Sequence, residues 1–365
     1  MTTHEPIGVG VIGAGYWGPN LVRNVQATPG LRLRYLCDLD VERARRVLGE
    51  YSTVQAVSSL DAVLADPDVA AVAVATPAAT HHAVVMAALE AGKHVLVEKP
   101  LAPTLEEGRT LVAAAEERGL VLMLDHTYCY TAAVAHLRTL VQAGEVGDLQ
   151  YLDSVRINLG LVQRDVDVLW DLAPHDLSIF DSLLPDGVGP VAVSAHGSDP
   201  IGAGHACVAH LTIQLSNGAM AHVHVNWLSP TKIRTLVVGG SRRTVVWDDL
   251  NPSQRLSVYD RGVDTAIPQQ RVRDDSAARE RATVSYRLGD MVAPALPERE
   301  ALRAVMEEFA AAITERRAPL TDGRAGLRVL ALLESAAASM AEGGAFVPVL
   351  DALAPADLVL DGASS

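Results

Sequence analysis

Residues 7–18 read Ile-Gly-Val-Gly-Val-Ile-Gly-Ala-Gly-Tyr-Trp-Gly, an apolar strand that runs directly into a glycine-rich turn. Gly13, Gly15 and Gly18 have the G-x-G-x-x-G spacing, and a helical pattern of apolar residues follows them. The first glycine permits a tight turn, the second lets a pyrophosphate approach the backbone, and the third allows close packing of the helix on the strand. The stretch predicts a dinucleotide-binding Rossmann unit.

An acidic residue, Asp38, follows the next apolar run, Leu31–Cys37. A carboxylate there accepts hydrogen bonds from an adenosine ribose diol and repels a 2′-phosphate, which favours NAD over NADP. We also place Tyr16 and Trp17, inside the turn, among the cofactor contacts; the alternative for Trp17 is simple packing. The competing interpretation of the motif is a glycine turn that binds no ligand.

The first 126 residues alternate strand and helix patterns with short connections. Apolar runs at 69–75, 94–97 and 120–124 read as further strands, and Thr104 reads as the cap of a helix that ends before Gly119. Strands that are apolar throughout and separated by helices predict a parallel sheet covered on both faces. We therefore expect a Rossmann domain over residues 1–126.

The pattern changes after residue 145. Runs at 149–159, 206–215, 219–227, 233–238 and 243–247 read as strands with few helices between them, and helices are expected at 173–184 and 299–316. Asn217-Gly218 and Gly239-Gly240 predict tight turns, and 261–281 predicts a loop. The fold class is thus α/β: a doubly wound parallel sheet, then an α+β domain over 127–350 with a large, mostly antiparallel sheet, and a tail over 351–365.

Composition excludes several classes of protein. The formal charge of −14 argues against nucleic-acid and anionic-membrane partners, which need a basic face. No apolar stretch reaches the roughly 20 residues that span a bilayer, and the N-terminus lacks the features of a signal peptide. The three cysteines are widely separated, which fits the reducing cytoplasm better than a disulfide framework or a thiolate zinc site.

Several separated motifs identify a family. Thr76-Pro77 with His81, Gly92-Lys93-His94-Val95 and Glu98-Lys99-Pro100 resemble the Gfo/Idh/MocA oxidoreductases. The stretches Gly15–Asn20 and Trp170–Asp176 resemble the branch of that family that acts on sugar nucleotides and related amino sugars. The resemblance runs from about residue 7 to 345.

The resemblance implies a substrate site between the two domains, beside the nicotinamide of NAD. By position, Lys99 matches the lysine of the E-K-P motif, and Asp171 and His175 match the D-x-x-x-H pair. The outer face of the second sheet often forms an oligomer interface in this family, so a homodimer or homotetramer is expected. The further residues assigned to cofactor binding are Thr76, Pro77, His81, Glu98 and Lys99 itself.

The chemistry of alcohol oxidation fits the same three residues. A base must accept the hydroxyl proton while hydride leaves the same carbon, and a histidine such as His175 has a suitable pKa of about 6.5. Pro174 predicts that His175 lies in the first turn of a helix, where the positive end disfavours the imidazolium. Lys99 stabilises the developing alkoxide, and Asp171 holds either Lys99 or His175 in place. Further substrate contacts are expected from Tyr130, Arg156 and Asn158.

The leading hypothesis is an NAD-dependent dehydrogenase that oxidises a secondary ring hydroxyl of a nucleotide sugar, amino sugar or glycosylated natural product to a ketone. Alternatives are a cyclitol dehydrogenase of the inositol type, a glycosidase that uses NAD for transient oxidation, and an NAD-binding sensor. The presence of Lys99, Asp171 and His175 speaks against a sensor, because a sensor does not need a proton acceptor beside the nicotinamide. His222 and His224 share a strand face but lack a third ligand of clear spacing, so no metal is expected.

Overall fold

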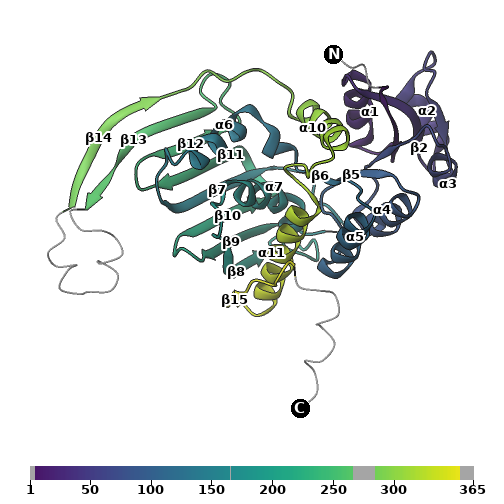
Figure 1. Ribbon diagram of the computed structural model, residues 1–365. Coiled ribbons are helices and arrows are strands. Elements are labelled where there is room, and N and C mark those ends of the chain that lie inside the picture. Colours follow the sequence, from purple (N-terminus) through teal and green to yellow (C-terminus); the bar gives the residue numbers. More distant parts are fainter. Residues whose placement is uncertain (1–4, 165, 266–283, 354–365) are drawn as a thin grey trace.

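The computed structural model describes residues 5–164, 166–265 and 284–353, which form two β-sheets with their covering helices (Figure 1). The first sheet has the strand order β3-β2-β1-β4-β5-β6, and all its strands are parallel. This is the doubly wound order in which the topology reverses between β1 and β4. Its strands are β1 (Ile7–Ile12), β2 (Leu31–Cys37), β3 (Gln55–Val57), β4 (Ala71–Val74), β5 (His94–Glu98) and β6 (Leu122–Asp125).

The helices of the first domain alternate with these strands, as their apolar periodicity predicts. The side chain of Thr104 caps the fifth helix by accepting a hydrogen bond from the Glu107 amide. Two short 3₁₀ turns, η1 (Ala78–Thr80) and η2 (Thr127–Tyr130), follow strands β4 and β6. The helices are α1 (Gly18–Ala27), α2 (Val41–Leu48), α3 (Leu60–Leu64), α4 (His81–Glu90) and α5 (Leu105–Glu117).

The second sheet has nine strands in the order β14-β13-β12-β11-β7-β10-β9-β8-β15. Only β7 and β10 pair in parallel; the other pairings are antiparallel. The predicted fold class is confirmed. The strands are β7 (Leu149–Leu159), β8 (Pro190–Ser198), β9 (Val208–Leu215), β10 (Met220–Asn226), β11 (Leu228–Gly240), β12 (Thr244–Asp248), β13 (Leu256–Thr265), β14 (Val284–Val292) and β15 (Val347–Pro348).

In the described part of the chain, the helices that accompany this sheet are α6 (Ala132–Gln142), α7 (Val168–Leu183), α10 (Ala301–Glu315) and α11 (Gly323–Ala341). Figure 1 shows α10 beside α1 of the first domain and α11 between the nine-stranded sheet and α5. The buried side chains of α10, including Phe309, belong to the same apolar cluster as those of β1 and α1. The chain therefore returns to the Rossmann core after it has built the second sheet.

Three local predictions are corrected. The helix expected at 173–184 begins at Val168, because Asp167 caps it by accepting a hydrogen bond from the Trp170 amide at 2.9 Å. Gly239 and Gly240 lie within β11, and the turn follows them. Of the loop expected at 261–281, residues 261–265 belong to β13, which pairs with β14, and residues 266–281 lie outside the described residues.

The described residues contain neither a membrane-spanning helix nor a cluster of metal ligands. Within residues 5–164, 166–265 and 284–353, no helix has the length and apolarity that a membrane crossing requires. In the same part of the chain, no group of three or more His, Cys, Asp or Glu residues is arranged to hold a metal ion. His222 contacts Asp153 at 3.0 Å, and His224 stacks on His210 with ring centroids 4.1 Å apart.

Candidate active site

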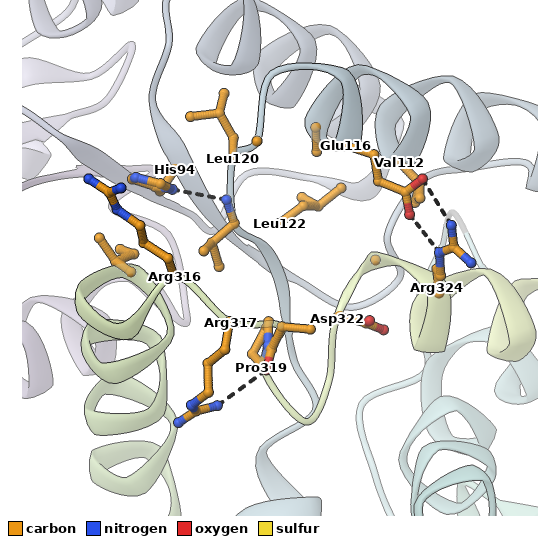
Figure 2. Close-up of a pocket in the computed structure, with 16 residues that line it drawn as sticks. His94, Val112, Glu116, Leu120, Leu122, Arg316, Arg317, Pro319, Asp322 and Arg324 are labelled. Carbon is orange, nitrogen blue, oxygen red and sulfur yellow. Dashed lines mark hydrogen bonds and ion pairs between the residues drawn. The ribbon is translucent and has the colours of Figure 1, made fainter. Parts of the chain in front are cut away.

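The parallel sheet has one edge formed by the amino ends of its strands and another formed by their carboxyl ends, and the two edges hold different residues. One cavity, of about 550 Å³, is lined by His94 and Leu122, which begin β5 and β6, together with Arg316 and Arg324. Figure 2 shows these residues around it. Ligands of open α/β sheets bind at the carboxyl ends of the strands, beside the point where the strand order reverses. This cavity lies at the other edge, and the predicted site residues lie at the carboxyl edge.

The glycine-rich turn has the geometry that its spacing predicts. Gly13 has φ +101°, and a Cβ atom there would lie 2.5 Å from the Ala75 carbonyl oxygen. A Cβ atom on Gly18 would overlap the carbonyl oxygen of Gly13. A Cβ atom on Gly15 would meet nothing within 4 Å. Gly13 and Gly18 thus close the turn, and Gly15 leaves open the space that a pyrophosphate needs.

The acid and the aromatic residues of this turn are held differently. Asp38 accepts hydrogen bonds from the amides of Ala14 at 2.7 Å and Asp40 at 2.8 Å, and a carboxylate has lone pairs left for ribose hydroxyls. Tyr16 is 95% exposed. Trp17 donates its indole N–H to Asp125 at 3.1 Å, which joins the turn to the end of β6.

His81 joins two loops at the same edge. Its ring is 1% exposed, with Nε2 2.9 Å from the Thr76 carbonyl oxygen and Nδ1 2.7 Å from that of Pro100. Burial lowers the pKa of His81, against the effect of the two carbonyls. His81 thereby links the loop after β4, which holds Thr76, to the loop after β5, which holds Pro100, and a neutral ring donates its one N–H to one of these two carbonyls.

Glu98 and Asp125 are register partners at the ends of β5 and β6. Burial, followed by the charge of Asp125, raises the pKa of Glu98 well above its usual value. Glu98 Oε1 and both ring nitrogens of His126 have no partner among the described residues. Burial, with a smaller effect of Lys99, lowers the pKa of His126 to about 3. Burial therefore favours the neutral forms of Glu98 and His126 next to Lys99.

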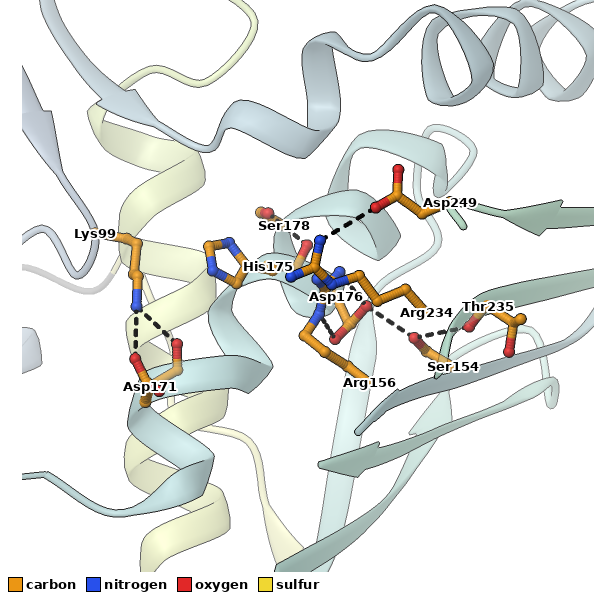
Figure 3. Close-up of polar contacts among 10 residues, drawn as sticks. All are labelled: Lys99, Ser154, Arg156, Asp171, His175, Asp176, Ser178, Arg234, Thr235 and Asp249. Atoms are coloured by element: carbon orange, nitrogen blue, oxygen red, sulfur yellow. Dashed lines mark hydrogen bonds and ion pairs between the residues drawn. The ribbon is translucent and has the colours of Figure 1, made fainter. Parts of the chain in front are cut away.

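Lys99 and Asp171 form an ion pair across the two domains (Figure 3). Lys99 Nζ donates to Asp171 Oδ1 at 3.1 Å and to the Asp171 backbone carbonyl at 2.7 Å. The other carboxylate oxygen accepts the indole N–H of Trp227 at 3.0 Å. The sequence left open whether Asp171 holds Lys99 or His175, and in the structure its partner is Lys99.

His175 lies one helical turn after Asp171 on α7, with its ring beside Lys99 in Figure 3. Because α7 begins at Val168, Pro174 lies within the helix and His175 is not at its positive end, which corrects the sequence-based argument for a neutral base. Burial is the main cause that holds the pKa of His175 well below 6.5, followed by the positive charges of Lys99 and Arg156. His175 Nδ1 is buried without a partner in the described residues.

The predicted substrate contacts occupy three different environments. Arg156 is 2% exposed and donates to both oxygens of Asp176 at 2.8 and 3.0 Å, so it is buried behind the site. The Tyr130 hydroxyl is paired with Thr321 Oγ1 at 2.9 Å. Asn158 is partly exposed near the end of β7, close to Gly160. Asn158 and Tyr130 are both partly exposed, and the hydroxyl of Tyr130 is already paired with Thr321.

Tyr128, which the sequence analysis missed, is the centre of an aromatic and cationic cluster. Its ring packs edge-on against His175, with centroids 5.0 Å apart, and against Trp247 at 6.0 Å. The guanidinium of Arg156 lies 4.3 Å from the ring centroid and that of Arg234 lies 5.6 Å from it. No spacing in the sequence connects Tyr128 to Arg234 or Trp247.

Known proteins resemble this chain over most of its length. Residues 7–126 match the family described as "Oxidoreductase family, NAD-binding Rossmann fold", and residues 165–349 match "Oxidoreductase family, C-terminal alpha/beta domain". UDP-N-acetylglucosamine 3-dehydrogenase of Acidithiobacillus ferrooxidans is 34% identical over 323 residues, which cover 88% of this chain and 93% of that protein.

Solved structures give the same result. A structure of the Acidithiobacillus ferrooxidans enzyme has a TM-score of 0.77 at 31% identity and covers 93% of this chain and 99% of its own. An inositol dehydrogenase homologue from Azotobacter vinelandii, solved with NADH and myo-inositol, has a TM-score of 0.75 at 24% identity, covering 94% and 98% of the two chains. At that identity, the second likeness concerns the fold alone.

Proposed function

Because this chain belongs to the Gfo/Idh/MocA oxidoreductase family, whose N-terminal domain is an NAD-binding Rossmann fold, we propose that it oxidises a secondary ring hydroxyl of a nucleotide sugar or related amino sugar to a ketone. The observation that carries this proposal is the meeting of Lys99, Asp171 and His175 at the carboxyl edge of the Rossmann sheet. The similarity to a UDP-N-acetylglucosamine 3-dehydrogenase supports the substrate class.

The residues of the site supply the proton chemistry of this oxidation. Bound NAD would supply the hydride acceptor; the turn of Gly13, Gly15 and Gly18 would hold its pyrophosphate, and Asp38 would accept hydrogen bonds from its ribose. His175 takes the hydroxyl proton, because its depressed pKa keeps the imidazole neutral and able to accept. The ammonium of Lys99 donates a hydrogen bond to the substrate oxygen and stabilises negative charge as it develops there.

Asp171 is a positioning residue in this scheme. Its carboxylate bonds Lys99 with one oxygen and the buried Trp227 with the other, so the lysine is held by a side chain that is itself fixed. Pro174 adds to this arrangement, since a proline within a helix cannot donate to the carbonyl four residues earlier and disturbs the ladder near Asp171. The backbone carbonyl of Asp171, in this turn of α7, is the second acceptor of Lys99 Nζ.

We also propose the division of the chain. Residues 1–126 bind the cofactor, residues 127–350 bind substrate and make a homodimer or homotetramer, and 351–365 form a tail. The outer face of the nine-stranded sheet supports the assembly, because residues such as Met220, which is 42% exposed, and His222 and His224 alternate there with the buried Ala221 and Val223.

The test is a substrate panel with NAD, followed by absorbance of NADH. We expect turnover with UDP-N-acetylglucosamine or an amino sugar and a keto sugar as product. Turnover with inositols alone would give a cyclitol dehydrogenase, and release of a leaving group without NADH would give a glycosidase. Bound NAD without turnover of any substrate would contradict the proposal and favour a sensor.

The variant that tests the site is His175→Ala. We expect kcat to fall by roughly 10²–10⁴-fold, the usual contribution of a general base, while NADH binding is kept. His136→Ala, at a partly exposed histidine of α6, is the matched control and should retain activity. Near-normal activity of His175→Ala would remove this residue from the mechanism.

A further inference from the structure

Arg234, on β11, has hydrogen-bonding capacity that its neighbours do not use. It is the register partner of Arg156 on β7, yet the two guanidinium groups are held very differently. Arg156 donates to both oxygens of Asp176 and is fully buried. Among the described residues, the side chain of Arg234 makes one hydrogen bond, from Nη1 to Asp249 at 3.3 Å, and it is 27% exposed.

The unused donors of Arg234 lie at the reaction centre. Figure 3 shows its guanidinium between Asp249 and His175. Nε is buried without a partner among the described residues, and a buried donor in this condition calls for an explanation. Of the five N–H donors of an arginine, one bonds Asp249 and one is the buried Nε–H, so the three others on Nη1 and Nη2 are left for a ligand, in the fork geometry that matches phosphate and carboxylate groups.

A second cavity, of about 440 Å³, adjoins this residue on the side of Asp249. Asp249 and Trp247 line it, and Trp247 packs against Tyr128, which in turn packs against His175. The Trp247 indole nitrogen is also buried without a partner in the described part of the chain. Arg255, an exposed guanidinium for which the described residues offer no ion pair, lines the same cavity. Asp249 therefore connects Arg234 to a cavity that also contains the guanidinium of Arg255.

We propose that Arg234 binds an anionic substituent of the substrate, a phosphate or carboxylate attached to the ring that His175 acts upon, and that the cavity beside Asp249 receives the group carrying that charge. The inference rests on the proposed function for its reacting ring, and it adds the requirement that the substrate be charged. Arg156 does not serve this purpose, because it is 2% exposed and Asp176 takes the edge of its fork formed by Nε and Nη2.

The test measures binding and so does not depend on turnover. UDP and, separately, glucuronic acid are titrated into the NADH-bound protein by calorimetry, with Arg234→Gln, Arg234→Lys and the wild type compared. We expect the Kd of one probe to rise about tenfold or more in Arg234→Gln and less in Arg234→Lys, which keeps the charge but loses the fork. Binding of UDP would identify a diphosphate as the anion, and binding of glucuronic acid a carboxylate.

Controls separate binding from folding. Arg243→Gln removes an arginine that pairs with Glu145 at the other end of β12, and it should leave the Kd unchanged. Asp249→Asn removes the carboxylate that competes for Arg234, so we expect the probe to bind as tightly as in the wild type or more tightly. Each variant's melting temperature and NADH affinity are measured in parallel.

The results that overturn the inference are specific. It fails if Arg234→Gln binds both probes as the wild type does, if neither probe binds to the wild type, or if Asp249→Asn loses binding to the same extent as Arg234→Gln. None of these outcomes touches the proposed oxidation, which would still be visible as NADH formed from UDP-N-acetylglucosamine or an amino sugar. Absence of NADH from every sugar, with the binding pattern intact, would instead contradict the proposed function.

Discussion

At the scale of single residues, the protonation state of His175 is set by its surroundings rather than by one partner. Burial disfavours the imidazolium, and Lys99, Arg156 and Arg234 add positive charge nearby. The neutral form is the one that accepts a proton, so activity is present above the pKa of His175 and is lost as the pH falls through it.

This sign leads to a prediction for the pH dependence of kcat/KM. Because the pKa of His175 lies well below 6.5, we expect kcat/KM to show no loss attributable to this group between pH 8 and 6.5, with the acidic limb below that range. Lys99→Met removes one of the charges that lower the pKa of His175. The acidic limb of its residual kcat/KM should therefore lie at a higher pH than in the wild type. An acidic limb at or above pH 6.5 in the wild type would contradict this account.

At the scale of elements, the turn between β1 and α1 separates a structural glycine from a ligand-facing one. A Cβ atom at position 18 overlaps the Gly13 carbonyl, whereas one at position 15 enters open space. The two positions therefore respond differently to the same substitution, although the motif treats them alike.

We predict that Gly18→Ala lowers the melting temperature and weakens NAD binding, because the turn must open to accept the methyl group. Gly15→Ala should leave the melting temperature within about a degree or two of the wild type, in line with a surface substitution of ±0.5 kcal/mol, while the Kd for NAD rises. Thermal melts and NADH fluorescence titrations of the pair measure both effects. A Gly15→Ala protein that binds NAD normally would show that the cofactor does not approach this residue.

At the scale of the whole molecule, the first domain is completed by a segment almost 300 residues away from its first strand. Phe309 of α10 is 1% exposed within the cluster that contains Val9 and Leu21. Arg23 of α1 donates to both oxygens of Glu300, directly before α10, at 2.8 and 2.6 Å. The two sheets are therefore joined by packing as well as by the chain.

Phe309→Ala is predicted to lower the free energy of unfolding by about 3–5 kcal/mol, the usual loss for a buried phenylalanine that leaves a cavity. Phe346→Ala is the matched control, because Phe346 is 49% exposed and its loss should change the free energy by about 0.5 kcal/mol or less. Urea denaturation measures both. Equal effects of the two substitutions would mean that α10 is not part of the core.

Local patterns in the sequence determined a large part of this protein. Strands β1, β2 and β7 have the bounds that their apolar runs predict, because a buried strand needs little beyond its own composition to be recognised. The glycine spacing and Asp38 indicated the dinucleotide site, since a turn and its acid lie close together in the chain. Lys99, Asp171 and His175 were identified by their motifs.

Only the tertiary structure decided what these residues contact. It paired Asp171 with Lys99 and buried Arg156 against Asp176. It paired the Tyr130 hydroxyl with Thr321. It also brought Tyr128 beside both His175 and Arg234. It also extended α7 past Pro174, so that burial and charge, rather than a helix end, keep His175 neutral. The physical reason is that spacing along a chain encodes local geometry, whereas hydrogen bonding, burial and charge depend on segments that meet only after folding.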